Sequence, residues 1–123
     1  GNLVFVSGQV PWVGGERNFV GKVGIDYTVE EGQDAARTVA LNIIAQVKAA
    51  CDGDLDRVVR CIKLGGFVNC PDNFHQQPQV INGASDLMVD VFGDAGRHSR
   101  FAVGAPALPF NVAVEIDAVF EVR

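Results

Sequence analysis

The twelve residues at 111–122, just before Arg123, alternate between two kinds of side chain with a period of two. One set is apolar and consists of Val112, Val114, Ile116, Ala118, Phe120 and Val122. The other set is mixed and consists of Asn111, Ala113, Glu115, Asp117, Val119 and Glu121. Because successive side chains of a strand point to opposite faces of a sheet, this pattern predicts a strand over 111–122 with one buried face. Its second face is only partly polar.

Two segments show helical periodicity instead. Thr28 and Glu31 form a T-x-x-E capping box, after which apolar residues recur at three- and four-residue steps as far as Ala50. Gly53 stands where a C-terminal glycine cap is expected. A second helix is expected over about 73–92, with a true start near Pro78, because proline is tolerated in the first turn of a helix.

Four further strands are expected ahead of the last one. They are a buried strand at 3–7, a short strand after a turn at Gly14–Gly15, a strand over 57–69 with a bulge or bend at Gly65–Gly66, and a strand at 99–104. The order is then ββαβαββ, a mixed α+β sheet with two helices on one face. Since no third helix covers the other face, a homo-oligomer is expected to cover it.

Composition supports one domain over residues 1–123. The chain is 48% hydrophobic, which excludes disorder, and it contains no apolar run long enough to span a membrane. Its 10 basic and 15 acidic residues give a net charge of −5, which argues against non-specific binding to nucleic acid. The chain opens on Gly1 directly before a strand, so an N-terminal segment is expected to be missing.

Cysteine and histidine offer few chemical signals. Cys51, Cys61 and Cys70 contain no CxxC pair, which is typical of reduced, buried thiols in a cytoplasmic protein. A metal site on Cys70 and His75 is the alternative, but it lacks a second close pair of ligands. His75 and His98 are isolated, so each has either a surface or capping role or that of a general base.

The segment RHSR at 97–100 is the strongest candidate site. Arg100 begins an apolar strand, where a guanidinium needs an anionic partner. That partner is either Glu115 or Asp117 on a neighbouring strand, in a salt bridge, or the carboxylate of a substrate in a bidentate clamp. Glu115 is similarly open to two interpretations, as a solvated or paired acid or as a group that holds a water.

Several stretches also carry a resemblance to a known family. They are LVFVSGQVP at 3–11, EEGQDAARTVALN at 30–42, GDLDRVVRCIKLGGFVN at 53–69, VINGASDL at 80–87 and RFAVGAPALPFNVAVEIDAVFEV at 100–122. Together they resemble the RidA (YjgF) family over nearly the whole chain. The resemblance implies a chorismate-mutase-like α+β fold and a homotrimer whose three sheets form a central barrel, with ligand pockets between subunits.

The best-known members of that family hydrolyse 2-aminoacrylate and related 2-imino acids to 2-keto acids and ammonia without a metal or organic cofactor. By position, the resemblance implies that Arg100 grips the substrate carboxylate and that Glu115 orients or activates water. It also implies that Gly8 approaches the ligand through its backbone N–H and that Asn82 lies near the pocket.

The chain departs from the family pattern in two places. Ala102 replaces a pocket cysteine, and a pocket tyrosine would lie before Gly1. These departures suggest a divergent branch. The alternatives to deamination are an endoribonuclease or translation-inhibitor activity and non-catalytic binding of small carboxylates, while a small carboxylate substrate remains the expected partner.

Overall fold

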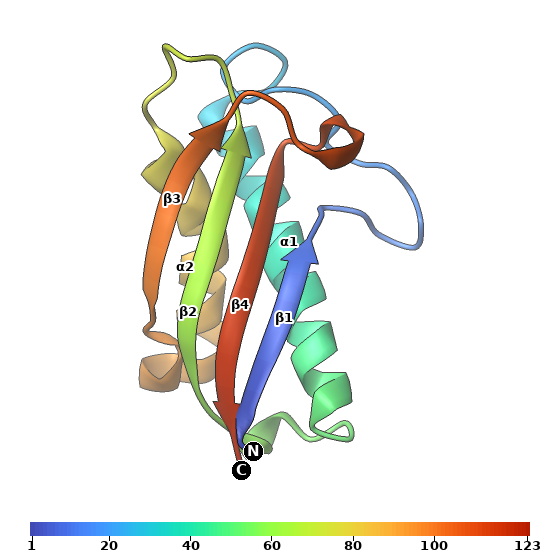
Figure 1. The fold of residues 1–123 in the computed structure, drawn as a ribbon, viewed down its shortest axis with the longest axis vertical. Helices are drawn as coiled ribbons and strands as arrows, with labels where there is room; N and C mark the ends of the chain where they lie inside the picture. Colours follow the sequence, from blue (N-terminus) through green and yellow to red (C-terminus); the bar gives the residue numbers. More distant parts are fainter.

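The computed structural model describes residues 1–123 and contains one four-stranded sheet with two long helices behind it (Figure 1). The long elements follow the order β1 (Leu3–Gln9), α1 (Val29–Ala50), β2 (Val58–Asn69), α2 (Gln77–Phe92), β3 (Ser99–Ala105) and β4 (Val114–Val122). Three short 3-10 helices, η1 (Leu55–Arg57), η2 (Gly93–Gly96) and η3 (Pro109–Asn111), lie between them. The expected α+β class with two helices is therefore confirmed.

The strands lie in the order β1-β4-β2-β3, so β1 and β3 form the two edges of the sheet. β4 pairs antiparallel with both of its neighbours, whereas β2 and β3 run parallel, with Leu64 opposite Arg100. A parallel pair needs a long crossover connection, and α2 supplies it. The chain ends lie side by side at one end of the sheet (Figure 1).

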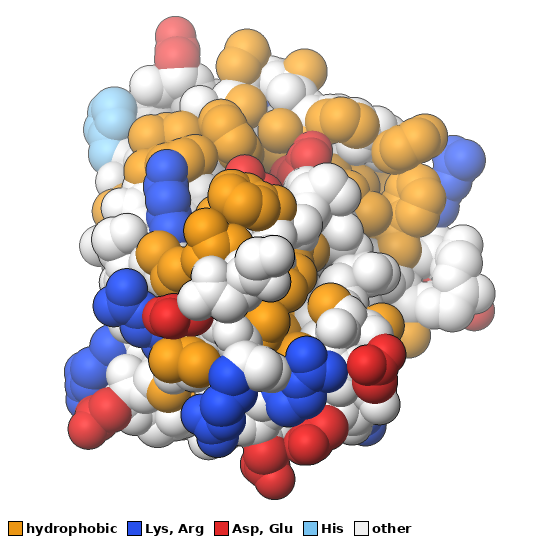
Figure 2. Space-filling model, turned by 60° about the horizontal axis from the view of Figure 1, so that its bottom comes forward, with side chains coloured by type: hydrophobic (Ala, Val, Ile, Leu, Met, Phe, Trp, Pro, Cys, Tyr) orange, Lys and Arg blue, Asp and Glu red, His pale blue; other side chains and the backbone are white.

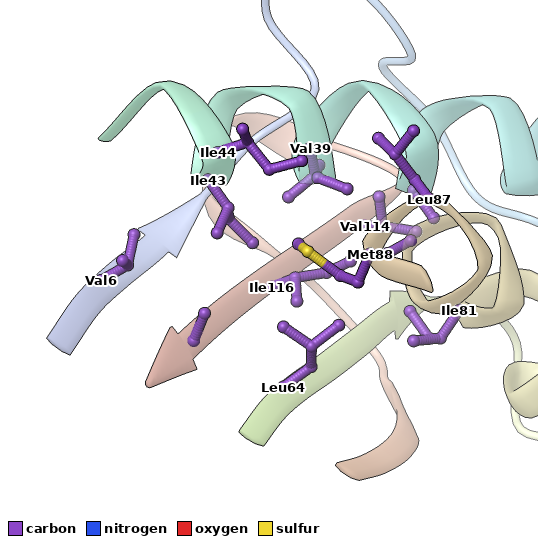
Figure 3. Close-up of a cluster of buried hydrophobic side chains, with 14 of the residues drawn as sticks. Val6, Val39, Ile43, Ile44, Leu64, Ile81, Leu87, Met88, Val114 and Ile116 are labelled. Carbon is purple, nitrogen blue, oxygen red and sulfur yellow. The ribbon is translucent and has the colours of Figure 1, made fainter. Parts of the chain in front are cut away.

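The core lies between the sheet and the two helices, and Figure 3 shows side chains from both layers meeting there. Val39 and Ile43 of α1 and Met88 of α2 are fully buried in it, together with Leu64 and Ile116 from the sheet. All six apolar residues of the alternating C-terminal set are buried, which confirms the expected face of that strand. β4 itself begins at Val114, three residues later than the expected start.

The first helix starts as expected. The Thr28 hydroxyl accepts from the Glu31 N–H at 3.1 Å, and the Glu31 carboxylate accepts from the Thr28 N–H at 3.0 Å. At the other end, Gly53 adopts a φ of 91° and donates its N–H to the Lys48 carbonyl at 2.8 Å. α2 begins at Gln77 with Pro78 in its first turn, in agreement with the expected start near that proline.

The short strand expected after Gly14–Gly15 is not formed, so the observed order is βαβαββ. Residues 10–28 form a loop with three isolated bridges, one of which joins Val20 to Val112. Phe19 and Gly21 have positive φ angles of 54° and 141°, which interrupt extended backbone on both sides of Val20.

The prediction of a bulge or bend at Gly65–Gly66 is also wrong. β2 keeps its register with both neighbours there, and its irregularities fall between residues 58 and 63 instead. Both glycines make room for side chains. A Cβ at Gly65 would lie 2.7 Å from the Phe101 ring, and one at Gly66 would lie 2.8 Å from Ile81. Close packing of Gly65 against neighbouring strands and of Gly66 against α2 therefore explains this glycine pair.

No helix covers the second face of the sheet. Large hydrophobic side chains are exposed on it, among them Leu3, Phe5, Phe67 and Val103. In Figure 2, hydrophobic side chains gather across the upper part of the surface, while Lys and Arg are interspersed with Asp and Glu below them. Neither α1 nor α2 combines the length and the apolar character that a membrane-spanning helix requires.

Candidate functional site

Arg100 and Asn82 line one pocket of about 260 Å³ between α2 and the start of β3. Arg100 lies opposite buried Leu64 in the parallel register, so its side chain leaves the sheet on the face that carries the helices. There its Nη1 donates to the Ser85 hydroxyl at 3.0 Å and its Nη2 donates to the Pro78 carbonyl at 3.3 Å. The side chain is half-buried and held against α2.

The guanidinium of Arg100 makes no ion pair within the chain. The three salt bridges join Arg57 to Asp52, Arg60 to Glu121 and Arg97 to Asp94. The salt bridge to Glu115 or Asp117 that the sequence left open is absent, because β3 pairs with β2 and not with β4. Two of the five guanidinium donors are occupied by neutral acceptors, so the positive charge is available to an anion.

Gly8 and Glu115 form a second pair. Glu115 is half-buried on the helix-free face of the sheet, opposite Phe67 of β2. The register of β1 with β4 breaks between Val6 and Gln9, and Gly8 lies in that irregularity. A Cβ at Gly8 would overlap the carboxylate of Glu115. The carboxylate therefore rests directly against the Gly8 backbone. Any residue with a Cβ at position 8 would displace it.

The structure does not bring these two pairs together within one chain. Arg100 lies on edge strand β3 and on the helix side of the sheet. Glu115 lies on the helix-free side, next to the opposite edge strand β1. The pocket of Arg100 is lined by Asn82, Ser85, Asp86, Val89, Arg97 and His98, without Gly8 or Glu115. Each pair, Arg100 with Asn82 and Gly8 with Glu115, is thus half of the set of four candidate site residues that the sequence indicated.

Two further residues line the Arg100 pocket: Ser85, which the sequence reasoning missed, and His98, which it considered only as an isolated histidine. Ser85 Oγ lies 2.9 Å from His98 Nε2, and His98 Nδ1 lies 2.7 Å from the Gly96 carbonyl oxygen. Ser85 is three residues after Asn82, hence on the same helix face. His98 is two residues before Arg100, hence on the same side of the chain if the extended backbone continues there. These two spacings were the available signal.

A second cavity of about 380 Å³ lies where the parallel strands end, and both Cys70 and His75 line it. No group of three or more His, Cys, Asp and Glu side chains is placed to hold a metal ion. The three cysteines are buried and free. Burial raises the pKa of the Cys61 thiol from 9.0 to about 12, which makes this core thiol a poor nucleophile.

The chain matches a known family over nearly its whole length. Residues 1–121 match the family described as "YjgF/chorismate mutase-like, putative endoribonuclease". The chain belongs to the YjgF family. Its two helices on a four-stranded mixed sheet are the YjgF/chorismate-mutase-like α+β fold.

The chain is also similar to proteins from three organisms. The chain is 51% identical to Protein TCP17 of Trypanosoma cruzi over 126 residues. This match covers 100% of the chain and 77% of TCP17. It is 52% identical to Atu1372 of Agrobacterium tumefaciens, a protein of unknown function, with a TM-score of 0.98 over 100% of this chain and 77% of the other. The E. coli protein TdcF, solved with bound serine, is 27% identical, with a TM-score of 0.64 over 100% of this chain and 82% of its own.

Proposed function

We propose that the chain hydrolyses reactive 2-imino acids, and the enamines that tautomerise to them, to 2-keto acids and ammonia. The observation that carries this proposal is the Arg100 guanidinium, which is held against α2 without an acidic partner in a pocket shared with Asn82. A flat guanidinium binds a carboxylate through two parallel N–H donors. The bound serine of the relative TdcF, itself an amino acid, agrees with a ligand that carries a carboxylate.

The chemistry asked of the site is limited. Water adds to C2 of the imine, and the carbinolamine that forms expels ammonia to leave a C=O group at C2. Glu115 accepts one proton from the attacking water and passes it to the imine nitrogen, which gives the carbinolamine. The hydroxyl proton of the carbinolamine then moves to the nitrogen through the same carboxylate, so that the C–N bond breaks, ammonia leaves and the C=O group forms. The reaction needs no metal or organic cofactor. Most of the acceleration comes from holding the carboxylate and the water in attack geometry.

The site is completed by a second chain in this proposal. Three copies form a barrel through the apolar helix-free face of the sheet, so that Arg100 and Asn82 of one copy face Gly8 and Glu115 of the next. Exposed Leu3, Phe5 and Phe67 on that face support an interface. The opposite locations of the two residue pairs support it as well, because one chain alone leaves each pair incomplete. Three free thiols favour the cytoplasm as the location.

The first experiment measures keto-acid release from 2-imino acids that an amino-acid oxidase generates in situ. We expect the wild-type chain to exceed the spontaneous rate and Arg100→Ala to lower kcat/KM about 100-fold, since it removes a charge-assisted contact to the substrate. Arg37→Ala is the matched control, because Arg37 lies exposed on α1 and lines neither cavity. No acceleration by the wild type, or full acceleration by Arg100→Ala, refutes the proposal.

A mixing experiment tests whether the site is shared between chains. Arg100→Ala and Glu115→Gln are each expected to be inactive alone. Refolded together in equal amounts, they should recover about one quarter of the wild-type activity, because about one interface in four then joins two intact halves. Light scattering should give the mass of three chains. A monomer, or mixtures that stay inactive, refutes the shared site.

Two other activities are outcomes of the same measurements. Arg100-dependent binding of a keto acid without turnover would indicate a carboxylate-binding protein. An endoribonuclease, as the family description suggests, would bind RNA at low salt and lose it as salt rises. The net charge of −5 and the interspersed basic and acidic residues in Figure 2 disfavour such binding.

A further inference from the structure

A chain of hydrogen bonds leads from the candidate carboxylate-binding arginine to the backbone of η2. Arg100 Nη1 donates to Ser85 Oγ at 3.0 Å, Ser85 Oγ lies 2.9 Å from His98 Nε2, and His98 Nδ1 lies 2.7 Å from the Gly96 carbonyl oxygen. We propose that Ser85 and His98 are positioning residues that set the orientation of the Arg100 guanidinium. This inference rests on the proposed function in taking a carboxylate as the ligand of Arg100.

The direction of each hydrogen bond follows from the groups at the two ends of this hydrogen-bonded series, the Arg100 guanidinium and the Gly96 carbonyl. A carbonyl oxygen only accepts, so His98 Nδ1 carries a proton, and in the neutral ring Nε2 is then an acceptor. The Ser85 hydroxyl must donate to that Nε2. Its lone pairs remain for Arg100, which can only donate. Every group therefore has one role, and the serine hydroxyl has one orientation.

Fixing the arginine matters for binding because its side chain is long. An arginine side chain has many rotamers, and a ligand must overcome the loss of this rotamer entropy if the guanidinium is free to move. Here Ser85 and the Pro78 carbonyl, both on α2, take one donor from each of its terminal nitrogens. Three of the five donors remain for an anion. Preorganisation of this kind improves affinity without adding a contact to the ligand.

The alternative is that Ser85 and His98 only attach β3 to α2. A purely structural connection would lower stability when cut and would affect ligand binding regardless of what stands at position 100. A positioning role acts through Arg100 alone. The difference appears in a double-mutant cycle, because residues that act in series do not have additive effects.

The test uses the full chain and pyruvate, a small 2-keto acid, in an NMR titration. Ser85→Ala and His98→Phe are each expected to weaken pyruvate binding about tenfold, the effect of losing one hydrogen bond to a charged group. The double variant should be no weaker than Ser85→Ala. In an Arg100→Ala background neither change should have a further effect, and Ser85→Thr, which keeps the hydroxyl, should bind as the wild type does.

Two matched controls use residues outside the chain of hydrogen bonds. Ser99→Ala removes a hydroxyl that donates to the Ile62 carbonyl on β2, and His75→Gln removes the other histidine, which lines the second cavity. Both should bind pyruvate as tightly as the wild type. Nitrogen-15 spectra of the His98 ring give a readout that needs no ligand, and we expect the Nδ1–H tautomer.

Several results would overturn the proposal. Additive effects of Ser85→Ala and His98→Phe, equal effects in the Arg100→Ala background, an Nε2–H tautomer, or no pyruvate binding by the wild type each do so. Its failure is separable from that of the proposed function. Imine hydrolysis that depends on Arg100 but not on Ser85 or His98 refutes only the positioning role. The expected binding pattern without accelerated hydrolysis refutes only the deaminase.

Discussion

Replacing Gly83 by alanine should destabilise the protein, although alanine is the better helix former. Gly83 follows Asn82 on α2 at the point where this helix crosses α1. A Cβ at Gly83 would overlap the Gln33 carbonyl oxygen and would lie 2.8 Å from the carbonyl carbon and 2.9 Å from Cα of the same residue. These are backbone atoms of a helix, so they cannot move aside as a side chain would.

The size of the effect follows from two opposing terms. Relief of the overlap requires α1 and α2 to move apart at their crossing, and overpacking of this kind costs about 3 kcal/mol at the upper end of its usual range. Alanine in place of glycine returns about 1 kcal/mol of helix propensity. The net loss is about 2 kcal/mol. For a chain of 123 residues, that corresponds to a drop in Tm of about 8 °C.

Thermal unfolding followed by circular dichroism measures this drop at one fixed protein concentration. Gly32→Ala is the matched control, because a Cβ there would meet only side-chain atoms of Val80 and Val23, at 3.1 to 3.2 Å. Its effect should be smaller, and Val80→Ala should relieve part of it. A Gly83→Ala protein that melts at or above the wild-type temperature would contradict the argument that backbone contact sets the helix crossing.

Three further perturbations have defined outcomes. Thr28→Ala removes the side-chain half of the capping box and should cost about 1 kcal/mol in urea unfolding; an unchanged midpoint would mean that the cap contributes nothing. Gly8→Ala displaces the Glu115 carboxylate and should lower kcat for imine hydrolysis at least about tenfold while Tm stays near the wild-type value. Because burial raises the pKa of Cys61 from 9.0 to about 12, the unfolded chain loses this proton first. Relative to Cys61→Ala, the free energy of unfolding should therefore keep its full value below pH 9 and fall by about 1.4 kcal/mol per pH unit up to about pH 12. Parallel pH profiles of the unfolding free energy for the two proteins would exclude the effect.

Features that depend on local sequence were predictable. The capping box of Thr28 and Glu31 forms within a single turn, and the alternation over 111–122 depends only on the geometry of a strand. The missing strand after Gly14–Gly15 shows the limit of such reasoning. Whether a short apolar segment becomes a strand depends on a partner elsewhere in the chain, and Val20 finds only an isolated bridge to Val112.

The neighbours of β3 were the main point that local pattern did not reveal. A salt bridge between Arg100 and Glu115 assumes that two strands adjacent in sequence are adjacent in the sheet. The helix between β2 and β3 instead makes them a parallel pair, which places β3 at the edge and directs Arg100 toward α2. The residue types were identified from sequence, but their surroundings required the crossover connection.

The sheet topology gives the exposed apolar face and the separation of the two residue pairs a common cause. A four-stranded sheet with both helices on one side leaves Phe5 and Phe67 exposed on the other, and it separates Arg100 from Glu115 by both strand order and face. Burying the exposed face against further copies removes apolar surface from water and, in the proposed arrangement, also joins the two residue pairs. Assembly and catalysis would then be lost together when the interface is weakened. A charged substitution such as Phe5→Lys should therefore abolish activity even though Phe5 belongs to neither pair.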